Sequence, residues 1–535
     1  MSSENLFTHT PLFRDIMAGG FRVSFFEENK DVVVQSGTTI SDAAKTAGVN
    51  IELPCAGKGR CGRCAVHVSD SKDGTPARVL ACTTKVEKDI FVKIPSEDGA
   101  VVASNDYRKV EIGKISPVVK SKDPNYGIAV DIGTTTIAVS IVDMNNGLDL
   151  YSAAGENRQR LRGEDVLARI QYAEEGGTEE LRTLVVDAIN DLIDICLDRR
   201  CSPDSMNAVY VSGNTTMIHL FLGIDPSPIR IEPYEPVIKK AEISGFESGL
   251  RVNPNAKVIC MPSVSAYVGG DVTADIVSSG MDASNKLSLL IDVGTNGEVA
   301  LGDKEIMMVC SSSAGPAFEG GQTTSGMLAR TGAIDSVRII NGRIEFTTIG
   351  SADPKGICGS GIIDLIAEMF RNGWIDKKGS FTGKVKTETV DGSTYLRIIG
   401  DVRISQDDIN TIILTKAAIY SSTEALVKNM GISFDDLETI YIAGGFGNFI
   451  GMENAIAIGL FPDIPRDKYA YIGNASLAGA KYALLSSSFR VRIDKAFDRM
   501  TYLDLGSNPL FFDEYSSAQF LPHTDISRFP SVNEL

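Results

Sequence analysis

The chain has 535 residues, a hydrophobic fraction of 43% and a formal net charge of −17. This length exceeds what one hydrophobic core supports, so we expect several domains of ordinary α/β composition. The negative charge argues against nucleic acid or an anionic membrane as a partner, because either surface would repel it. No apolar run reaches the roughly 18 residues that span a bilayer, and residues 1–20 show no secretory signal. We therefore expect a cytoplasmic protein with reduced cysteines.

Residues 21–97 are predicted to form a small β-rich domain. The segments FRVSFF, DVVVQ, CAVHV, RVLACTT and DIFVKIP have the short apolar pattern of strands. The segment ISDAAKTAGV is predicted to be a helix that begins after Thr38 and Thr39 and ends near Gly48. One sheet with one helix and a cysteine loop is typical of the β-grasp layout of [2Fe–2S] ferredoxins.

Four cysteines of this domain follow the pattern C-x5-C-x2-C-x17-C: Cys55, Cys61, Cys64 and Cys82. Three thiolates from one loop and a fourth from a later strand match the ligand set of a [2Fe–2S] cluster. Glycines within the loop (Gly57, Gly59 and Gly62) let the backbone approach an inorganic core closely. A zinc site is the alternative, but zinc usually takes two C-x2-C pairs or a Cys/His mixture. The spacing therefore favours iron and electron transfer.

Residues 98–125 mix charges with short apolar pieces and are predicted to be a linker. From Tyr126 onward, strands alternate with long helices. One predicted helix lies in 178–200, whose apolar residues fall on one helical face. One pattern of this region occurs twice. GIAVDIGTTTIAVSIVD and LSLLIDVGTNGEVALGD each contain a strand, a Gly/Thr turn and a second strand. We therefore expect a duplicated α/β domain, with a first lobe over 126–285 that has a helical insertion and a second lobe over 286–535 that has a C-terminal extension.

The two Gly/Thr turns have the residues of a phosphate site. Glycine lets backbone N–H groups point inward, and Thr and Asn side chains add further donors. The predicted phosphate-binding residues are Gly133, Thr134, Thr135 and Thr136 in the first turn and Gly294, Thr295, Asn296 and Gly297 in the second. Asp131 and Asp292 end the preceding strands, where they can hold Mg²⁺ directly or through water. One such turn alone could be an ordinary β-hairpin turn that binds no ligand. Two such turns on opposite sides of a cleft would bind a polyphosphate from both sides.

A third element follows a later strand, TIYIAGGFGNF, whose glycines let a flat base approach the backbone: Gly444, Gly445, Phe446 and Gly447. In this order the three elements resemble the phosphate-1, phosphate-2 and adenosine motifs of the acetate and sugar kinase/Hsp70/actin superfamily. The resemblance implies two RNase-H-like lobes with ATP between them, joined by helices that we place at 264–280 and 414–430. A P-loop is excluded because GK[ST] does not occur.

A competing interpretation of the third element is a dinucleotide-binding fingerprint. Gly445-x-Gly447-x-x-x-Gly451 would bind the pyrophosphate, and Asp463 would bind the ribose of NAD(P). The spacing departs from GxGxxG, and this interpretation leaves the duplicated turns unexplained. It is therefore the weaker of the two.

Other polar residues have less specific signals. Asp271 and Glu298 are candidates for activating water near the phosphate site. Glu319, Gly320 and Gly321 are candidates for nucleotide contact, with a plain turn at the start of a helix as the alternative. For the histidines, we expect His219 to pack in the core, whereas His523 could contact a partner or lie in a turn. Cys358 has no visible histidine partner, so we expect a small buried residue.

An N-terminal [2Fe–2S] domain joined to such an ATPase resembles the reductive activators of corrinoid proteins. The resemblance extends to N-x-Q-x-x-x-G-x-D-V (157–166), SGNTT (212–216), SSSAGPAFEGG (311–321), GICGSG (356–361) and FLPHTD (520–525). It implies ATP-dependent reduction of Co(II) to Co(I) in a partner of a methyl-transfer system, an upstream low-potential electron donor and a homodimer. The corrinoid is expected on the partner, since no histidine here fits D-x-H-x-x-G.

Two other functions remain open from the residues. A small-molecule kinase with a fused ferredoxin domain would transfer phosphate to an acceptor without needing the cysteines. A redox-sensing module would use ATP only as a conformational signal.

Overall fold

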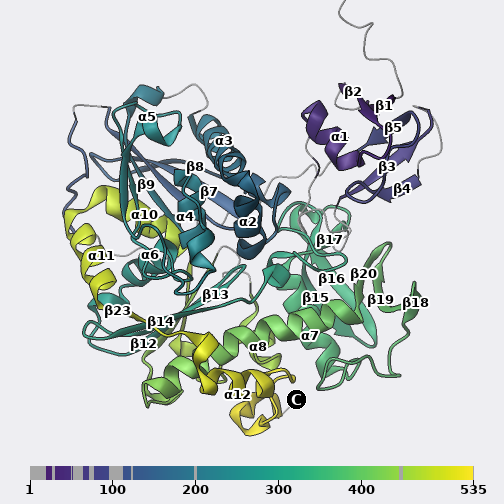
Figure 1. Cartoon of the computed structure of the whole chain (residues 1–535). Coiled ribbons are helices and arrows are strands. Elements are labelled where there is room, and N and C mark those ends of the chain that lie inside the picture. Colours follow the sequence, from purple (N-terminus) through teal and green to yellow (C-terminus); the bar gives the residue numbers. More distant parts are fainter. Residues whose placement is uncertain are drawn as a thin grey trace, which may run out of the picture. The chain divides into compact units, whose positions relative to one another are not determined.

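The structure is a computed structural model that describes residues 20–26, 30–49, 51, 64–71, 77–94, 113–121, 124–197, 202–444 and 450–533. Contacts between residues divide the chain into two units, Met1–Asp98 and Gly99–Leu535. Figure 1 shows the elements of both units.

The N-terminal unit is a five-stranded sheet with one helix, in the strand order β2-β1-β5-β3-β4. Its elements are β1 (Gly20–Phe25), β2 (Lys30–Gln35), α1 (Ile40–Ala47), β3 (Ala65–Ser69), β4 (Ala77–Leu80) and β5 (Ile90–Lys93). Thr39 caps α1 by accepting from the Asp42 N–H, and Gly48 ends the helix at φ 64°. Because β1 and β5 pair in parallel while the other pairs are antiparallel, the β-grasp prediction is confirmed.

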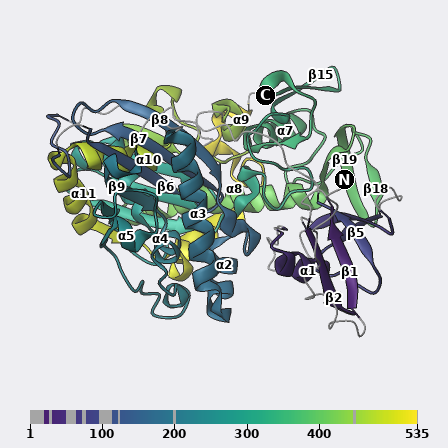
Figure 2. The same ribbon diagram turned by 90° about the horizontal axis from the view of Figure 1, so that it is seen from above.

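The first lobe of the second unit has a six-stranded sheet, in the order β10-β11-β9-β6-β7-β8. Its strands are β6 (Tyr126–Ile132), β7 (Thr136–Asp143), β8 (Asp149–Glu156), β9 (Met206–Gly213), β10 (Ala241–Ser244) and β11 (Lys257–Cys260). Its helices are α2 (Val166–Tyr172), α3 (Thr178–Leu197), α4 (Thr215–Leu222), α5 (Gly245–Ser248) and α6 (Gly270–Ser279). The apolar face predicted for α3 packs on β7 and β8, beside α4 (Figure 2).

The second lobe repeats this plan, in the order β22-β21-β12-β13-β14-β23. Its sheet consists of β12 (Ser288–Val293), β13 (Gly297–Gly302), β14 (Met307–Ser312), β21 (Thr439–Ala443), β22 (Tyr469–Gly473) and β23 (Met500–Tyr502). In both lobes a three-stranded antiparallel meander is extended by two parallel strands. The predicted duplication and its RNase-H-like lobes are confirmed.

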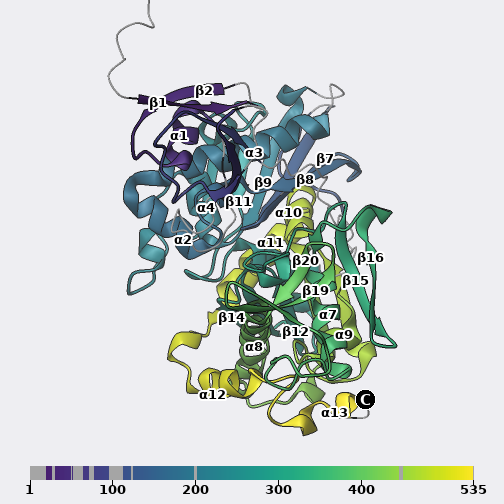
Figure 3. The same cartoon turned by 90° about the vertical axis from the view of Figure 1, so that its right-hand side faces the viewer.

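Two helices lie where the lobes meet, and one of them differs from the predicted pair. α6 lies within the predicted segment 264–280, but its partner is α10 (Ala475–Leu485) rather than a helix in 414–430. α10 packs against α6, β6 and β9, so a helix that follows β22 of the second-lobe sheet completes the first lobe (Figure 3). The packing is tight, since a Cβ at Gly479 would stand 2.8 Å from the Cα of Ala274.

Segment 414–430 belongs instead to α8 (Gln406–Asn429), which packs on β13 and β14 inside the second lobe. The pattern of its apolar residues did not distinguish these two roles, because almost the whole of α8 is buried on all sides. Before α8 the chain adds two small sheets and one long helix: β15 (Ala333–Ile340), β16 (Arg343–Thr348), β17 (Gly356–Ile357), α7 (Gly359–Arg371), β18 (Glu388–Val390), β19 (Ser393–Ile399) and β20 (Val402–Ser405).

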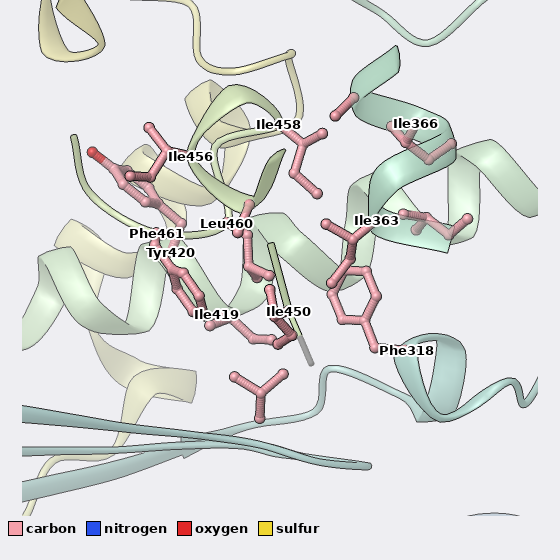
Figure 4. Close-up of a cluster of buried hydrophobic side chains, with 14 of the residues drawn as sticks. Phe318, Ile363, Ile366, Ile419, Tyr420, Ile450, Ile456, Ile458, Leu460 and Phe461 are labelled. Atoms are coloured by element: carbon pink, nitrogen blue, oxygen red, sulfur yellow. The ribbon is translucent and has the colours of Figure 1, made fainter. Parts of the chain in front are cut away.

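The remaining helices are α9 (Met452–Ala457), α11 (Ser487–Arg499), α12 (Pro509–Ala518) and α13 (Pro530–Asn533). The main core of the second lobe lies between its large sheet, α7, α8 and α9. Figure 4 shows Phe318, Ile363 and Ile419 of this core, which come from three different segments. The core therefore fixes the backbone immediately before Glu319, which matters for the site below.

The end of the predicted linker is packed rather than loose. The N–H groups of Ser116 and Val118 donate to the carbonyls of Leu485 and Leu484 at 2.8 and 2.9 Å. Among the helices in the described ranges, none is long and apolar enough to cross a membrane.

The FLPHTD motif anchors the C-terminal segment on α8. The ammonium of Lys416, which is fully buried, donates to the carbonyls of Phe520 and Pro522 at 2.6 and 2.7 Å. His523 is 2% exposed, and its Nε2 donates to Glu514 while its Nδ1 accepts the Asp525 N–H. His523 therefore has a structural role, and the open suggestion that it contacts a partner is wrong.

Glu514 makes this anchor sensitive to acid. Burial alone would raise its pKa, but the hydrogen bonds from His523 and Lys428 and the charge of Arg528 lower the pKa from 4.5 to about 2. A carboxylate with a depressed pKa stabilises the fold above its unfolded pKa, and this contribution is lost as pH falls from about 4.5 to about 2. The shift corresponds to about 3 kcal/mol at neutral pH.

We therefore expect Glu514→Gln to be less stable than the wild type at pH 7 and to approach it in stability near pH 3. Thermal unfolding followed by circular dichroism across this range measures the difference. Glu305→Gln, at an exposed glutamate in the β13–β14 turn, is the control. A stability difference that stays constant with pH would contradict the prediction.

Candidate functional site

Two of the four predicted cluster ligands lie in the described part of the chain. Cys64 and Cys82 are 2% and 9% exposed, and their sulfur atoms lie 3.2 Å apart. This distance is much longer than the roughly 2.05 Å of a disulfide bond. Since each iron of a [2Fe–2S] cluster takes two cysteine sulfurs, the pair fits one iron. Cys55 and Cys61 lie outside the described residues.

The second unit contains a cleft between its lobes that encloses about 1190 Å³ of empty space, part of it open to solvent. Both predicted phosphate turns and the start of the third motif reach this cleft. Of the predicted residues, those that line it are Asp131, Gly133, Thr134, Thr136, Asp271, Asp292, Gly294, Thr295, Asn296, Glu298 and Gly444. Residues from α6, from the start of α10, and from the segments at 318–319 and 327–329 also line it.

The first turn follows β6, and buried polar residues hold it in place. Asn157 donates to the Gly133 carbonyl at 2.8 Å, and Asn214 donates to the Thr134 hydroxyl at 3.0 Å. The Arg169 guanidinium, which is completely buried, donates to the Thr134 carbonyl, to the Gly163 carbonyl and to Gln159. Burial lowers the pKa of Arg169 to about 9, so it remains charged at neutral pH.

These contacts explain two motifs of the sequence. The N-x-Q-x-x-x-G-x-D-V segment supports the first turn through the hydrogen bond from Asn157 to the Gly133 carbonyl. Its Asp165 caps α2 by accepting from the Ala168 N–H. In the SGNTT segment, Asn214 caps α4 and also contacts the first turn. This motif therefore links the start of α4 to the turn that faces the cleft.

The second turn leaves room for a ligand. An atom at the Cβ position of Gly294 would lie 3.8 Å from the nearest surrounding protein atom and would project into the cleft. A side chain there would fill space that a phosphate needs. Gly444 ends β21 at φ 109°, and a Cβ there would stand 2.5 Å from the Val293 carbonyl oxygen. Glycine is therefore required where the third motif meets the second turn.

Besides Glu319, which is described below, five carboxyl groups line the same cleft: Asp131, Asp271, Asp275, Asp292 and Glu298. Asp131 accepts from Asn474 at 2.9 Å and from Ser476 at 2.7 Å, so the start of α10 holds it. Burial raises the pKa of Asp131, and burial together with the charges of neighbouring carboxylates raises the pKa of each of the other four. The carboxylates of one cleft therefore repel each other and create a strong preference for a cation.

No nitrogen or hydroxyl group of the described residues donates to the buried carboxyl oxygens of Asp275. Its contact is a hydrogen bond with the carboxyl group of Asp292, which raises the pKa of Asp275 and lowers the pKa of Asp292. Two buried carboxyl groups in contact are costly to ionise together, and a hydrated cation in the cleft would relieve that cost. No three His, Cys, Asp or Glu side chains in the described ranges are already arranged to hold a metal ion directly. Mg²⁺ keeps several waters and uses few protein ligands, so the arrangement fits Mg²⁺ that arrives with a polyphosphate.

The tips of the two turns touch each other through hydroxyl groups. Thr135 Oγ1 lies 3.2 Å from Thr295 Oγ1, and both hydroxyls donate to the Glu319 carboxylate. Thr135 is 3% exposed, so its side chain faces this contact rather than the open cleft. Glu319 thus joins the first lobe to the second.

Three predicted glycines do not line the cleft. Gly297 faces α8, where a Cβ would meet Ile419 at 2.7 Å. Gly320 adopts φ 76° and turns beside the Met327 backbone, and Gly321 packs on Pro316. At all three positions a Cβ would collide with neighbouring atoms, so packing alone explains the glycine. Gly445, Phe446 and Gly447 lie outside the described residues.

The dinucleotide alternative is not supported. The carboxylate of Asp463, which would bind a ribose, forms an ion pair with Arg466 at 2.7 Å and accepts a hydrogen bond from the Ser531 N–H at 2.7 Å. Its side chain is 3% exposed. The expected core roles of His219 and Cys358 agree with their exposures of 0% and 2%.

Glu319, a predicted candidate for nucleotide contact, lines the cleft. Four other residues of this site were not predicted from the sequence: Arg169, Asp275, Asn474 and Ser476. Two signals in the sequence could have found three of them. Asp275 lies one helical turn after Asp271, and Asn474-x-Ser476 follows a strand that ends in glycine, as Asn214 does. Arg169 had no comparable signal, because its partners include the Thr134 carbonyl, which is distant in the sequence.

The duplicated lobes, the paired turns and the carboxylate-lined cleft define a nucleotide-binding protein of the acetate and sugar kinase/Hsp70/actin type. It carries a ferredoxin-like domain with a thiol pair suited to iron. Three family models match the chain: a 2Fe-2S iron-sulfur cluster binding domain at 25–87, the RACo middle region at 126–284, and the C-terminal domain of RACo, the ASKHA domain, at 286–533. The chain belongs to the family of reductive activators of corrinoid proteins.

Similar proteins agree with this assignment. The corrinoid activation enzyme RamQ of Eubacterium limosum is 31% identical, over 92% of this chain and 98% of its own. The Co(II) methylated amine-specific corrinoid protein reductase of Methanosarcina barkeri is 26% identical, over 68% of this chain and 70% of its own. The solved structure of a reductive activator for a corrinoid, iron-sulfur protein is 32% identical, with a TM-score of 0.75, over 96% of this chain and all of its own.

Proposed function

We propose that this protein uses ATP to drive one-electron reduction of the Co(II) corrinoid of a partner protein and so restores Co(I). The observation that carries the proposal is the combination within one chain of the Cys64/Cys82 thiol pair and the two-turn cleft. The names of the similar proteins support the choice of a corrinoid protein as the partner. We further propose a cytoplasmic homodimer that receives electrons from a low-potential donor.

The energetics give a reason for combining the two units. When bound, a plant-type [2Fe–2S] cluster supplies one electron at about −400 mV. The Co(II)/Co(I) couple is expected to lie lower, and each ~59 mV of difference costs a factor of ten in a one-electron equilibrium. ATP must therefore change the complex so that an unfavourable transfer goes forward.

In this proposal the chain's polar residues bind MgATP across the cleft. Thr134, Thr136 and Asn296 line the phosphate region and offer donors, and Gly294 leaves the space that a phosphate occupies. Asp131, Asp292 and Asp271 would hold Mg²⁺ through its water molecules. The adenine would lie near Gly444, at the end of β21.

We further propose that contacts of Thr134 and Asn296 to the γ-phosphate close the lobes, and that Thr135 takes part through its hydroxyl contacts with Thr295 and Glu319. Thr135 is the most direct test, because its hydroxyl links the two lobes through Thr295 and Glu319. We expect Thr135→Ala to lower ATP turnover and corrinoid reduction together, each about tenfold, since one buried hydrogen-bonded link is lost.

Both rates should be measured on the same preparation of Thr135→Ala. Thr46→Ala, which removes a hydroxyl from α1 in the other unit, is the control and should leave ATP turnover unchanged. Loss of ATP turnover with undiminished corrinoid reduction would separate the two processes and contradict lobe closure as the coupling step.

The function itself is tested by anaerobic purification, iron and sulfide analysis, an absorption spectrum and an ATPase assay with and without a corrinoid protein. We expect a coloured protein whose ATP hydrolysis depends on the partner and leads to Co(I). A colourless zinc protein, or one that never binds adenine nucleotides, would refute the proposal. Phosphate transfer to a small acceptor, independent of the cysteines, would favour the kinase alternative.

A further inference from the structure

The position of Glu319 in the second lobe makes it relevant to ATP hydrolysis. Within the sheet, β21 lies on one side of the β12–β13 hairpin and β14 on the other. The third motif extends from β21, whereas Glu319 follows β14. A nucleotide with its base at Gly444 and its phosphates on the turns would therefore point its terminal phosphate toward Glu319.

The two carboxyl oxygens of Glu319 have different surroundings. Oε2 accepts hydrogen bonds from the Thr135 and Thr295 hydroxyls, one from each lobe. Oε1 faces the second turn and lies 4.0 Å from the Cβ position of Gly294, which points into the cleft. One oxygen is thus held in place, and the other is directed toward the space for the phosphates.

The backbone at Glu319 is also fixed. Phe318 is fully buried in the second-lobe core (Figure 4), and a Cβ at Gly359 would stand 1.9 Å from the Phe318 carbonyl oxygen. Gly320 then turns at φ 76° against the Met327 backbone. A carboxylate held on both sides by close packing is preorganised, as a residue that acts on a water molecule needs to be.

We propose that Glu319 is the general base of ATP hydrolysis and takes a proton from the water that attacks the terminal phosphate. The water oxygen forms a bond to the γ-phosphorus, and the bond from that phosphorus to the β–γ bridging oxygen breaks. The electron pair leaves with ADP, and the water proton passes to Glu319 and then to solvent. The inference rests on the proposed function, because it requires that this cleft hydrolyses ATP.

Two observations favour Glu319 over Asp271 and Glu298, which are the candidates from the sequence. Those two carboxylates belong to the group around Asp292, whose charges raise each other's pKa and suit a cation. The charge of Glu319 also raises the pKa of Asp292, but the hydrogen-bond partners of Glu319 are threonine hydroxyls, and the charges of Arg160 and Arg169 lower its pKa. Burial raises the pKa of Glu319 toward the range in which a carboxylate is an effective base.

The test compares Glu319→Gln with the wild type, using MgATP and the full-length protein. The amide oxygen of glutamine still accepts from the threonines, so the fold and the lobe contact are retained, but the amide takes no proton. We expect kcat for ATP hydrolysis to fall about 100-fold or more, while KM and the calorimetric Kd for MgATP change less than about threefold. The acidic limb of the kcat–pH profile should disappear, and Glu319→Asp should recover part of the rate.

The result separates this inference from the proposed function. If the wild type does not hydrolyse ATP with any partner, the proposed function fails. If the wild type hydrolyses ATP and Glu319→Gln retains its kcat, only the role of Glu319 is refuted. If Glu319→Gln binds MgATP more weakly but keeps its kcat, the role as general base is also refuted. Glu319 would then serve only to hold the two lobes together. Glu305→Gln, at an exposed glutamate in the β13–β14 turn, is the matched control and should keep the wild-type kcat and KM.

Discussion

Cys64→Ser is expected to abolish corrinoid reduction while leaving ATP turnover measurable. Cys64 and Cys82 place their sulfurs 3.2 Å apart, so removing one thiolate takes away one of the two cysteine ligands of one iron. The cysteines belong to the N-terminal unit, whereas the nucleotide cleft lies within Gly99–Leu535. Iron content, visible absorbance and the rate of Co(I) formation should therefore fall together, by about 100-fold for the rate.

The control for this variant is Cys196→Ala, which removes a buried thiol from α3. It should keep full iron content and colour. Retention of iron and absorbance by Cys64→Ser would contradict the ligand assignment. Equal loss of ATP turnover in Cys64→Ser would show instead that the two units depend on each other for folding.

Arg169→Met is expected to destabilise the second unit and to weaken nucleotide binding. The variant keeps an unbranched apolar chain in place of the aliphatic part of arginine but removes the donors to the Thr134 carbonyl, the Gly163 carbonyl and Gln159. Leaving several buried acceptors without a donor costs about 3–5 kcal/mol, a large fraction of the stability of a domain. The first turn loses its support, so we expect the affinity for MgATP to fall at least about tenfold.

Unfolding followed by circular dichroism and calorimetric titration with MgATP measure these two effects. Arg158→Met is the matched control, because Arg158 lies in the same segment but pairs with Asp191 at the surface. Exposed ion pairs contribute about 0–1 kcal/mol, so this control should change little. Unchanged MgATP affinity in a folded Arg169→Met protein would show that the first turn does not need this support.

Local patterns were sufficient to predict the larger features of the fold. The strand, turn and strand around Asp131 and Asp292 repeat the same short-range chemistry, and both copies form the predicted hairpins. The helix from Ile40 was predictable because Thr39 and Gly48 cap it through contacts within a few residues. Burial of the predicted helical face of α3 follows from its regular spacing of apolar residues.

The features that were missed depend on contacts between distant segments. The contacts of Glu319 with Thr135 and Thr295, and of Arg169 with the Thr134 carbonyl, were not predicted, because no periodicity in the sequence indicates such pairs. The same reason explains the misplaced connecting helix. α8 and α10 are both long apolar segments, and only the packing of Gly479 on Ala274 shows which of them joins the lobes.

The packing of α10 on the first lobe also affects how the chain folds during synthesis. Strands β6 and β9 emerge from the ribosome long before residues 475–485, which cover one face of their sheet. Such distant contacts raise the contact order and leave apolar surface exposed on the nascent chain. A truncated polypeptide that ends before Asn474 should therefore leave the first lobe incomplete and prone to aggregation.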